Sequence, residues 1–291
     1  GGETRTTPPP TPTWPATVTA APGGRPHPSP PAPPANPVVA AAAGGAAPAG
    51  DDLTLDFGTS GALYQSALVM YDRQTESLWT HFDGRAVMGT LIGTELVILP
   101  ATMVSWIDAS TAHPQASVLD RPTGPSARPY GSAPYPNYET AEPSPGYLSA
   151  DADDRLPEKK RVVGIDLDGR RAAIDRSALA ARGLVPFTIG GEPLIAVWKP
   201  GTTSALDGEQ IADGAEVGAV GVYRRVLDGQ ELTFEIGGTG AVVDAETGST
   251  WTVLGGASAG PLAGSDLEPV PHLDTFWFAW ARYHPDTAVI E

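Results

Sequence analysis

The chain has 291 residues, enough for one large domain or two of ordinary size. Its 34 acidic and 18 basic residues give a formal net charge of -16, which argues against phosphate backbones and anionic lipid surfaces as partners. It has no cysteine, which excludes disulfides and thiolate metal sites, and no apolar run of about 18 residues, which excludes a membrane-spanning helix.

The first 50 residues differ in composition from the rest of the chain. They hold 14 of the 31 prolines, few charges and a single aromatic residue, Trp14. A segment of this kind buries too little apolar surface to offset the entropy that is lost on ordering. We therefore expect residues 1–50 to be disordered or polyproline-like.

An internal repeat is the most informative feature of the remaining sequence. Residues 91–118 match residues 262–289 without a gap at an offset of 171, which relates Trp106 to Trp277 and His113 to His284. Upstream the offset becomes 172 and relates two copies of the motif Asp-x-x-Thr-x-Ser-x-Trp. Its residues are Asp72, Thr75, Ser77 and Trp79 in the first copy, and Asp244, Thr247, Ser249 and Trp251 in the second.

The first copy of the repeat is incomplete. Residues 162–227, which belong to the second copy, have no counterpart upstream, where the proline- and alanine-rich tract stands instead. Natural divergence, an engineered tract or a reading-frame error would each explain this. We interpret residues 51–120 as a partial first repeat, 121–160 as an irregular connection, and 161–291 as a complete second repeat that packs with the first as one domain.

Strand signals dominate the chain and predict a mainly β fold with a few short helices, a β-rich α+β class. Three hairpin turns are expected at Asp168-Gly169, Gly190-Gly191 and Asp228-Gly229, because these dipeptides tolerate a positive φ. The third hairpin would pair residues 218–226 with 231–236. Short helices are expected at Ser105–Ala112, at Ser177–Arg182 with Gly183 as C-cap, and at Asp274–Tyr283 with Asp274 as N-cap.

The repeated Asp-x-x-Thr-x-Ser-x-Trp motif admits two interpretations. Asp72 and Asp244 could form a catalytic carboxylate pair brought together by pseudo-symmetry. The favoured alternative is structural: the Asp accepts hydrogen bonds from backbone N–H groups in a turn, Thr and Ser join the hairpin, and the Trp packs on the core.

Other polar residues lie beside apolar segments and are candidates for binding a ligand. His113 and His284 each precede a proline at a helix end, where a favourable interaction with the helix C-terminus is more common than a shared metal ion. No third ligand suggests itself, so no metal or cofactor is expected. The ligand-binding candidates are Ser66, Arg73, His81, Ser204 and Asp207.

Several ordered segments resemble the domain-of-unknown-function family numbered 3179. The resemblance covers about residues 53–290 and implies little about activity. Members of that family are often exported, and many carry a Cys-Pro-x-Cys segment ahead of the position of Leu53, which this chain lacks. The segments are residues 66–79, Asp154-Arg-Leu-Pro157, Ser204-Ala-Leu-Asp207, Gly248-Ser-x-Trp251 with Gly260-Pro-Leu-x-Gly264, and Phe276-Trp-Phe-Ala-Trp280.

These observations lead to a functional hypothesis with two alternatives. The acidic composition, the β-rich repeat and the lack of a catalytic signature favour a non-enzymatic extracytoplasmic module that binds a small ligand or a partner surface. The first alternative is a metal- or thiol-dependent redox protein inactivated by loss of the cysteine segment. The second is a hydrolase that uses Asp72, Asp244 or Asp207.

Overall fold

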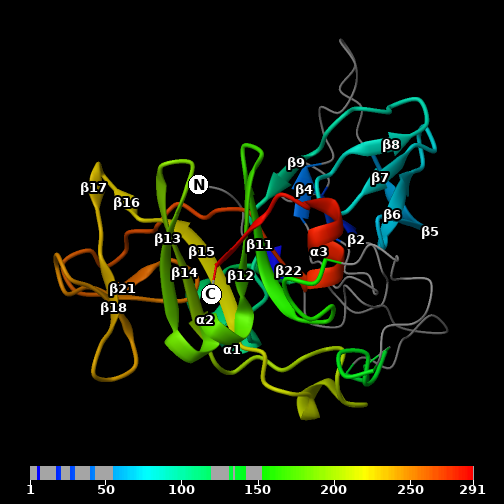
Figure 1. Cartoon of the computed structure of the whole chain (residues 1–291). Helices are drawn as coiled ribbons and strands as arrows, with labels where there is room; N and C mark the ends of the chain where they lie inside the picture. The colour runs from blue at the N-terminus through cyan, green and yellow to red at the C-terminus, as the bar shows by residue number, and fades with distance from the viewer. Residues whose placement is uncertain are drawn as a thin grey trace.

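A computed structural model describes residues 55–118, 131–133, 135–141 and 153–290, together with the backbone of four short strands between residues 5 and 42. The described part is mainly β, with several small sheets and three seven-residue α-helices (Figure 1). The predicted fold class is therefore confirmed. Helices of this length are too short to cross a membrane.

Two sheets in the second half of the chain lie beside each other (Figure 1), and one buried hydrophobic cluster lies between them. The hairpin expected at Asp168-Gly169 is confirmed, with φ of 53° and 80° in the turn and six paired residues on each side. The strand order is β22-β11-β12-β23 in one sheet and β13-β14-β15 in the other. Their bounds are Arg161–Leu167 (β11), Arg170–Asp175 (β12), Leu184–Ile189 (β13), Glu192–Lys199 (β14), Ala219–Arg224 (β15), His272–Phe276 (β22) and Ala288–Ile290 (β23).

Helix α2 (Arg176–Arg182) connects these two sheets. The Asp175 side chain accepts a hydrogen bond from the backbone N–H of Ser177 and so caps the first turn. Gly183 ends the helix with φ of 77°, as expected for a left-handed C-cap. The Leu179 side chain is fully buried in the core that both sheets share.

Two further four-stranded sheets have the same strand order, and each contains one copy of the Asp–Trp motif. The hairpin between β5 and β6 is longer than the one between β18 and β19, where the first copy has extra residues. One sheet consists of β5 (Phe57–Tyr64), β6 (Ala67–Asp72), β7 (Leu78–Thr80) and β8 (Ala86–Met88), and the other of β18 (Phe234–Ile236), β19 (Val242–Asp244), β20 (Thr250–Trp251) and β21 (Ala257–Ala259).

Helix α3 (Trp277–Tyr283) lies between strand β11 and the sheet β5–β8 (Figure 1). Phe82, which follows β7, stacks on Tyr283 with a centroid distance of 4.4 Å. On the other side, Gly164 in β11 faces the Trp280 ring, and a Cβ there would lie 2.2 Å from it. The helix therefore joins the two halves of the chain through aromatic contacts.

The last described elements are short. Helix α1 (Trp106–Ala112) agrees with the helix expected at Ser105–Ala112, and the Ser105 side chain caps its first turn. Nearby, Val104 packs against the core of the β18–β21 sheet. The remaining elements are β1 (Arg5–Thr6), β2 (Val18–Ala20), β3 (His27–Ser29), β4 (Ala40–Ala42), β9 (Val97–Leu99), β10 (Ser117–Val118), β16 (Val226–Leu227), β17 (Gln230–Glu231) and a 3-10 turn at Ile211–Asp213.

Two local expectations are wrong. Asp274 does not cap α3: it lies within β22, where Arg161 and Arg176 bind its carboxylate, and the helix begins three residues later. The hairpin at Asp228-Gly229 has only two paired residues on each side. Strand β15 pairs instead with β14, and β18 pairs with β19 in another sheet, because tertiary pairing overrides the local turn signal.

Two regions predicted from composition fall mostly outside the described residues. The first 50 residues, expected to be disordered, are described only as the backbone of β1 to β4. The connection at residues 121–160 is described in part, and its described residues form turns and one isolated bridge, from Ser132 to Gln210.

Candidate functional site

The Asp–Trp motif of the first half forms a closed hydrogen-bonded turn. Asp72 is fully buried at the end of β6 and accepts hydrogen bonds from the Thr75 backbone N–H at 2.5 Å and from Trp79 Nε1 at 2.9 Å. Ser77 Oγ accepts a bond from the Leu91 backbone N–H. The carboxylate thus connects the turn to the buried tryptophan, a contact that sequence spacing alone does not show.

The second motif has nearly the same geometry. Asp244 accepts bonds from Trp251 Nε1 at 2.9 Å and from the backbone N–H groups of Thr247 and Ser249. Burial acts to raise the pKa of Asp244, but the hydrogen bonds donated by Trp251, Thr247 and Ser249 outweigh it and lower this pKa. Asp72 and Asp244 lie in different sheets, and each carboxylate accepts its hydrogen bonds from residues of its own motif.

The five ligand-binding candidates lie on four different segments of the chain. Ser66 sits in the β5–β6 turn with φ of 66°, whereas Arg73 follows the opposite end of β6 and pairs with Asp56 at the surface. Ser204 and Asp207 lie in the loop between β14 and β15, where they accept hydrogen bonds from the backbone N–H groups of Leu206 and Ala215. The structure brings Ser204 and Asp207 into one loop and separates Ser66 from Arg73.

His81, the fifth candidate, is buried next to Phe82 after strand β7. Its side chain is 1% exposed, and neither ring nitrogen makes a hydrogen bond. Burial lowers the pKa of His81 to about 3, and burial together with the charge of Arg171 lowers that of His284 to about 4. Within the described ranges, no three His, Asp or Glu side chains are placed to hold a metal ion.

The buried histidines predict a stability that falls between pH 6.5 and pH 5. The unfolded chain protonates a histidine near pH 6.5, whereas folded His81 stays neutral to about pH 3, so the unfolded state binds more protons in this window. Each such group can contribute up to about 1.4 kcal/mol per pH unit. Urea unfolding at pH 7, 6 and 5 should show a shallower pH dependence for His81→Leu than for the wild type; parallel profiles would contradict the assignment.

A buried ionic cluster joins β11, α2 and β22. Arg161 donates to both carboxylate oxygens of Asp274, at 3.1 and 2.8 Å, and also pairs with Glu139. Arg176, 5% exposed, lies 2.6 Å from Asp274 and donates to the Gly218 carbonyl. Burial lowers the pKa of Arg176 to about 10. Sequence reasoning missed this cluster, although arginines at both ends of an apolar hairpin are an unusual signal.

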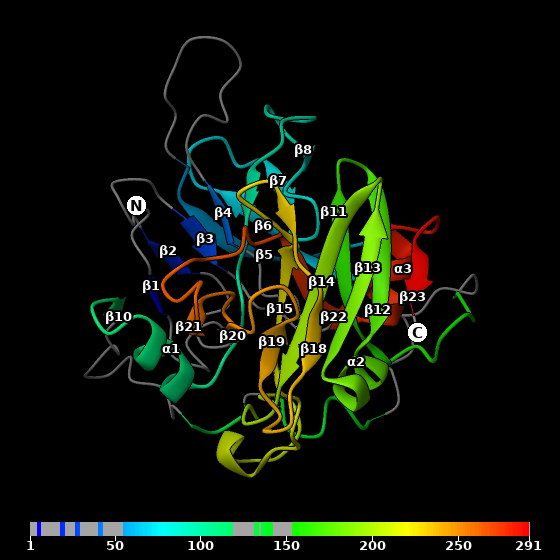
Figure 2. The ribbon, with the colours of Figure 1, turned by 90° about the vertical axis from the view of Figure 1, so that its left-hand side faces the viewer.

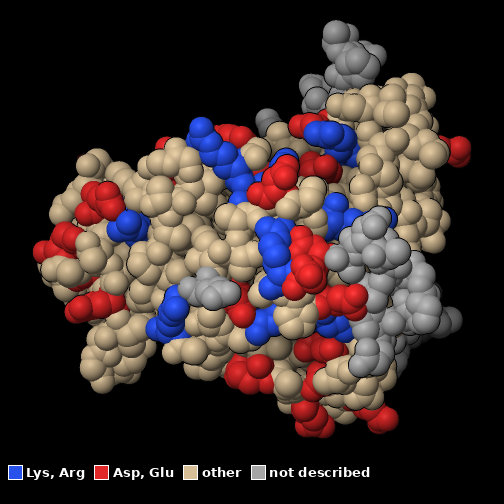
Figure 3. All heavy atoms as spheres, in the orientation of Figure 1, with Lys and Arg blue, Asp and Glu red and all other residues tan. Residues whose placement is uncertain are grey.

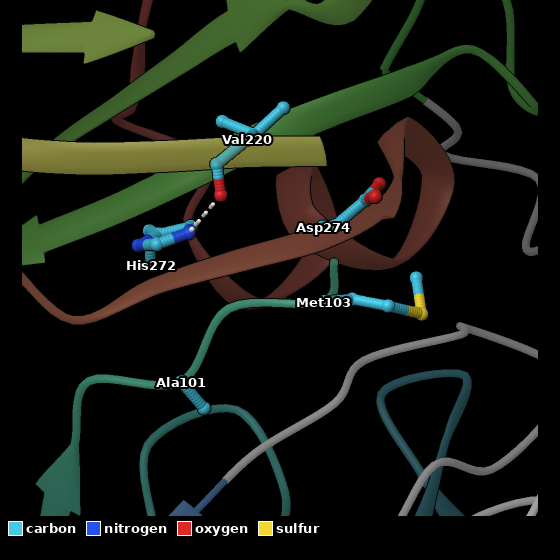
Figure 4. Close-up of a pocket in the computed structure, with 5 residues that line it drawn as sticks. All are labelled: Ala101, Met103, Val220, His272 and Asp274. Atoms are coloured by element: carbon cyan, nitrogen blue, oxygen red, sulfur yellow. Dashed lines mark hydrogen bonds between the residues drawn. The ribbon is translucent and has the colours of Figure 1, made fainter. Parts of the chain in front are cut away.

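A small cavity lies beside this cluster, between β22 and the chain that leads into α1 (Figure 4). Ala101, Met103, Val220, His272 and Asp274 line it, and its volume is about 20 Å³. The His272 ring contacts the carbonyl oxygens of Val270 and Val220, and burial lowers its pKa. This volume is sufficient for a single water molecule and for no organic ligand.

An exposed apolar surface is formed by α1 and β10, which lie together at the edge of the molecule (Figure 2). We call the side chains of Trp106, Ile107 and Val118, which are 54%, 71% and 46% exposed, the α1–β10 face. Trp277 and Phe278, 171 positions after Trp106 and Ile107, are 0% and 8% exposed. On the molecular face shown in Figure 3, by contrast, acidic and basic side chains are interspersed.

The fold and these sites define a mainly β protein with two Asp–Trp turn motifs and a buried arginine–carboxylate cluster. A family model matches residues 40–287, and the chain belongs to that family, described as protein of unknown function (DUF3179). Comparison with curated proteins gives no match, and comparison with solved structures gives none.

Proposed function

We propose that the chain is a non-catalytic extracytoplasmic module that binds another polypeptide through the α1–β10 face. The observation that carries this proposal is the exposure of Trp106 and Ile107 on consecutive positions of one short helix. Exposed tryptophan is costly to leave in water and common in protein interfaces, where it often supplies much of the binding energy. The acidic composition and the resemblance to exported proteins support the proposed location.

The polar site beside His272 and Asp274 is too small to bind an organic ligand. The cavity beside His272 and Asp274 holds about 20 Å³, whereas pockets for small molecules have volumes of several hundred Å³. The Asp274 carboxylate is already neutralised by two guanidinium groups. These groups are therefore better explained as a structural cluster than as a ligand site.

The catalytic alternatives find less support in the geometry. A hydrolase that uses a carboxylate pair would need at least two of Asp72, Asp244 and Asp207 in one site. These three residues instead accept hydrogen bonds within three separate turns or loops. A thiol-dependent redox reaction would need cysteine, which the chain lacks. No observation favours either one over a binding module.

The proposal is tested by site-specific photocrosslinking in cells that produce the protein. A benzophenone amino acid in place of Ile107 should form a covalent adduct with another polypeptide, and mass spectrometry of the adduct should locate the bond at position 107. The matched control carries the same group in place of Val226, a side chain in the second half of the sequence that is 41% exposed. Absence of an adduct at position 107, or equal adducts at both positions, would overturn the proposal.

A further inference from the structure

The sheet β5–β8 meets helix α3 through side chains, and we call this contact the junction. No strand of the sheet pairs with a described strand of the second half of the chain. The contact consists of the Phe82–Tyr283 stack and two hydrogen bonds, from the Tyr283 hydroxyl to the Tyr64 carbonyl at 2.9 Å and from Arg282 Nε to Gln65 Oε1 at 3.0 Å. Because opening it breaks no described strand ladder, it costs less free energy than unfolding either half.

Two histidines are buried at the junction with ring nitrogens that make no hydrogen bond to any described residue. His81 precedes Phe82, is 1% exposed, and has no partner for Nδ1 or Nε2. His284 follows Tyr283 at the end of α3, is buried, and has no partner for Nδ1. Its ring centre lies 4.3 Å from that of Trp280. Buried polar atoms without a partner are rare and lower stability, so these rings weaken the junction.

The charges around the two rings do not make up for the cost of protonating them in place. Within the described part of the chain, burial alone lowers the pKa of His81, to about 3. Burial and the charge of Arg171 lower the pKa of His284 to about 4, although the carboxylates of Asp166 and Asp83 act in the opposite direction. An imidazole in water protonates near pH 6.5, so protons bind the open junction in preference to the closed one as the pH falls.

We infer that the junction is an acid-sensitive switch, which opens when His81 and His284 bind protons and so releases the β5–β8 sheet from α3. Opening exposes the stacked rings of Phe82 and Tyr283 and the Trp280 ring beside them, while each sheet keeps its own strand ladder. The acid form therefore presents an aromatic surface that the neutral form hides. The switch and the α1–β10 face are formed by different elements, and neither depends on the other.

The size of the effect follows from the difference in proton binding between the two forms. A histidine with a pKa of about 3 or 4 in the closed form and about 6.5 in the open form shifts the opening equilibrium roughly 30-fold between pH 7.5 and pH 5.0. Two independent histidines shift it by up to about 800-fold. Above pH 6.5 neither histidine favours opening, and the junction stays closed.

A single introduced thiol measures opening directly, because the chain has no cysteine. Ala67→Cys places it at a fully buried position of β6, in the cluster that contains Phe82 and Trp280. Ala196→Cys is the matched control, at a fully buried position of β14 in the core between the two other sheets. The rate of reaction with 4,4′-dithiodipyridine is divided by that of a free peptide thiol at the same pH. From pH 7.5 to pH 5.0 this ratio should rise at least tenfold at position 67, and at pH 5.0 it should exceed that at position 196 at least a hundredfold.

Substitution of the histidines identifies the groups that titrate. In the Ala67→Cys background, His81→Leu and His284→Leu should each reduce the rise at least fivefold. The matched control His113→Leu, at the histidine that ends α1, should change it less than twofold. Glutamine in place of either histidine provides a second variant should leucine prevent folding, because its amide is polar and does not titrate.

Three results would overturn the switch. A rise smaller than tenfold at position 67 shows that the junction stays closed in acid. Equal ratios at positions 67 and 196 at pH 5.0 show that the whole chain unfolds instead. A rise that substitution of neither His81 nor His284 reduces assigns the opening to other groups.

Discussion

Asp274→Ala is expected to lower the free energy of unfolding by about 3–5 kcal/mol, because it leaves two buried arginines without their shared counter-ion. Arg161 would retain Glu139, but Arg176 is 5% exposed and its remaining hydrogen bond goes to the Gly218 carbonyl. Urea unfolding at pH 7 measures the loss. The control Asp154→Ala, at an exposed carboxylate close to the same elements, should change the unfolding free energy by less than about 0.5 kcal/mol.

A second substitution separates lost charge pairing from lost packing. In the Asp274→Ala background, Arg176→Met removes the uncompensated buried charge and keeps most of the side-chain volume. We expect the double variant to recover part of the lost stability, since an unpaired buried charge costs more than an apolar replacement. Strictly additive losses would show that the two residues are not energetically coupled.

The features that the sequence predicted correctly depend on neighbouring residues. The hairpin at Asp168-Gly169 follows from a dipeptide that adopts positive φ, and the end of α2 follows from the left-handed conformation of Gly183. Both interactions involve residues a few positions apart. Local chemistry is therefore sufficient to place them.

The features that were missed depend on pairing between distant segments. Asp274 has the residue type and position of a helix N-cap, yet its carboxylate binds Arg161, 113 positions earlier in the chain. The turn at Asp228-Gly229 forms, but which strands leave it and which sheets they enter are decided by packing. No spacing rule within the sequence predicts these partners.

The descent of the two halves from one unit stays a prediction. The two halves of the structure agree in one respect and differ in another. The sheets containing Trp79 and Trp251 agree in strand order and in the hydrogen bond to the aspartate. Trp106 and Trp277 differ, since one is half exposed and the other fully buried. The difference has a physical cause, because the segment that covers Trp277 has no described counterpart beside α1.

Substitution of Asp244 tests both the turn-capping role and the equivalence of the two motifs. Asp244→Ala is expected to cost about 3 kcal/mol or more, because it leaves the Trp251 Nε1–H and two backbone N–H groups unpaired in a buried place. Asp72→Ala should lower the free energy of unfolding by the same amount, within about 1 kcal/mol, if the two motifs contribute equally to stability. Losses below about 1 kcal/mol, measured by urea unfolding at pH 7, would favour a ligand-binding role for the carboxylate over a structural one.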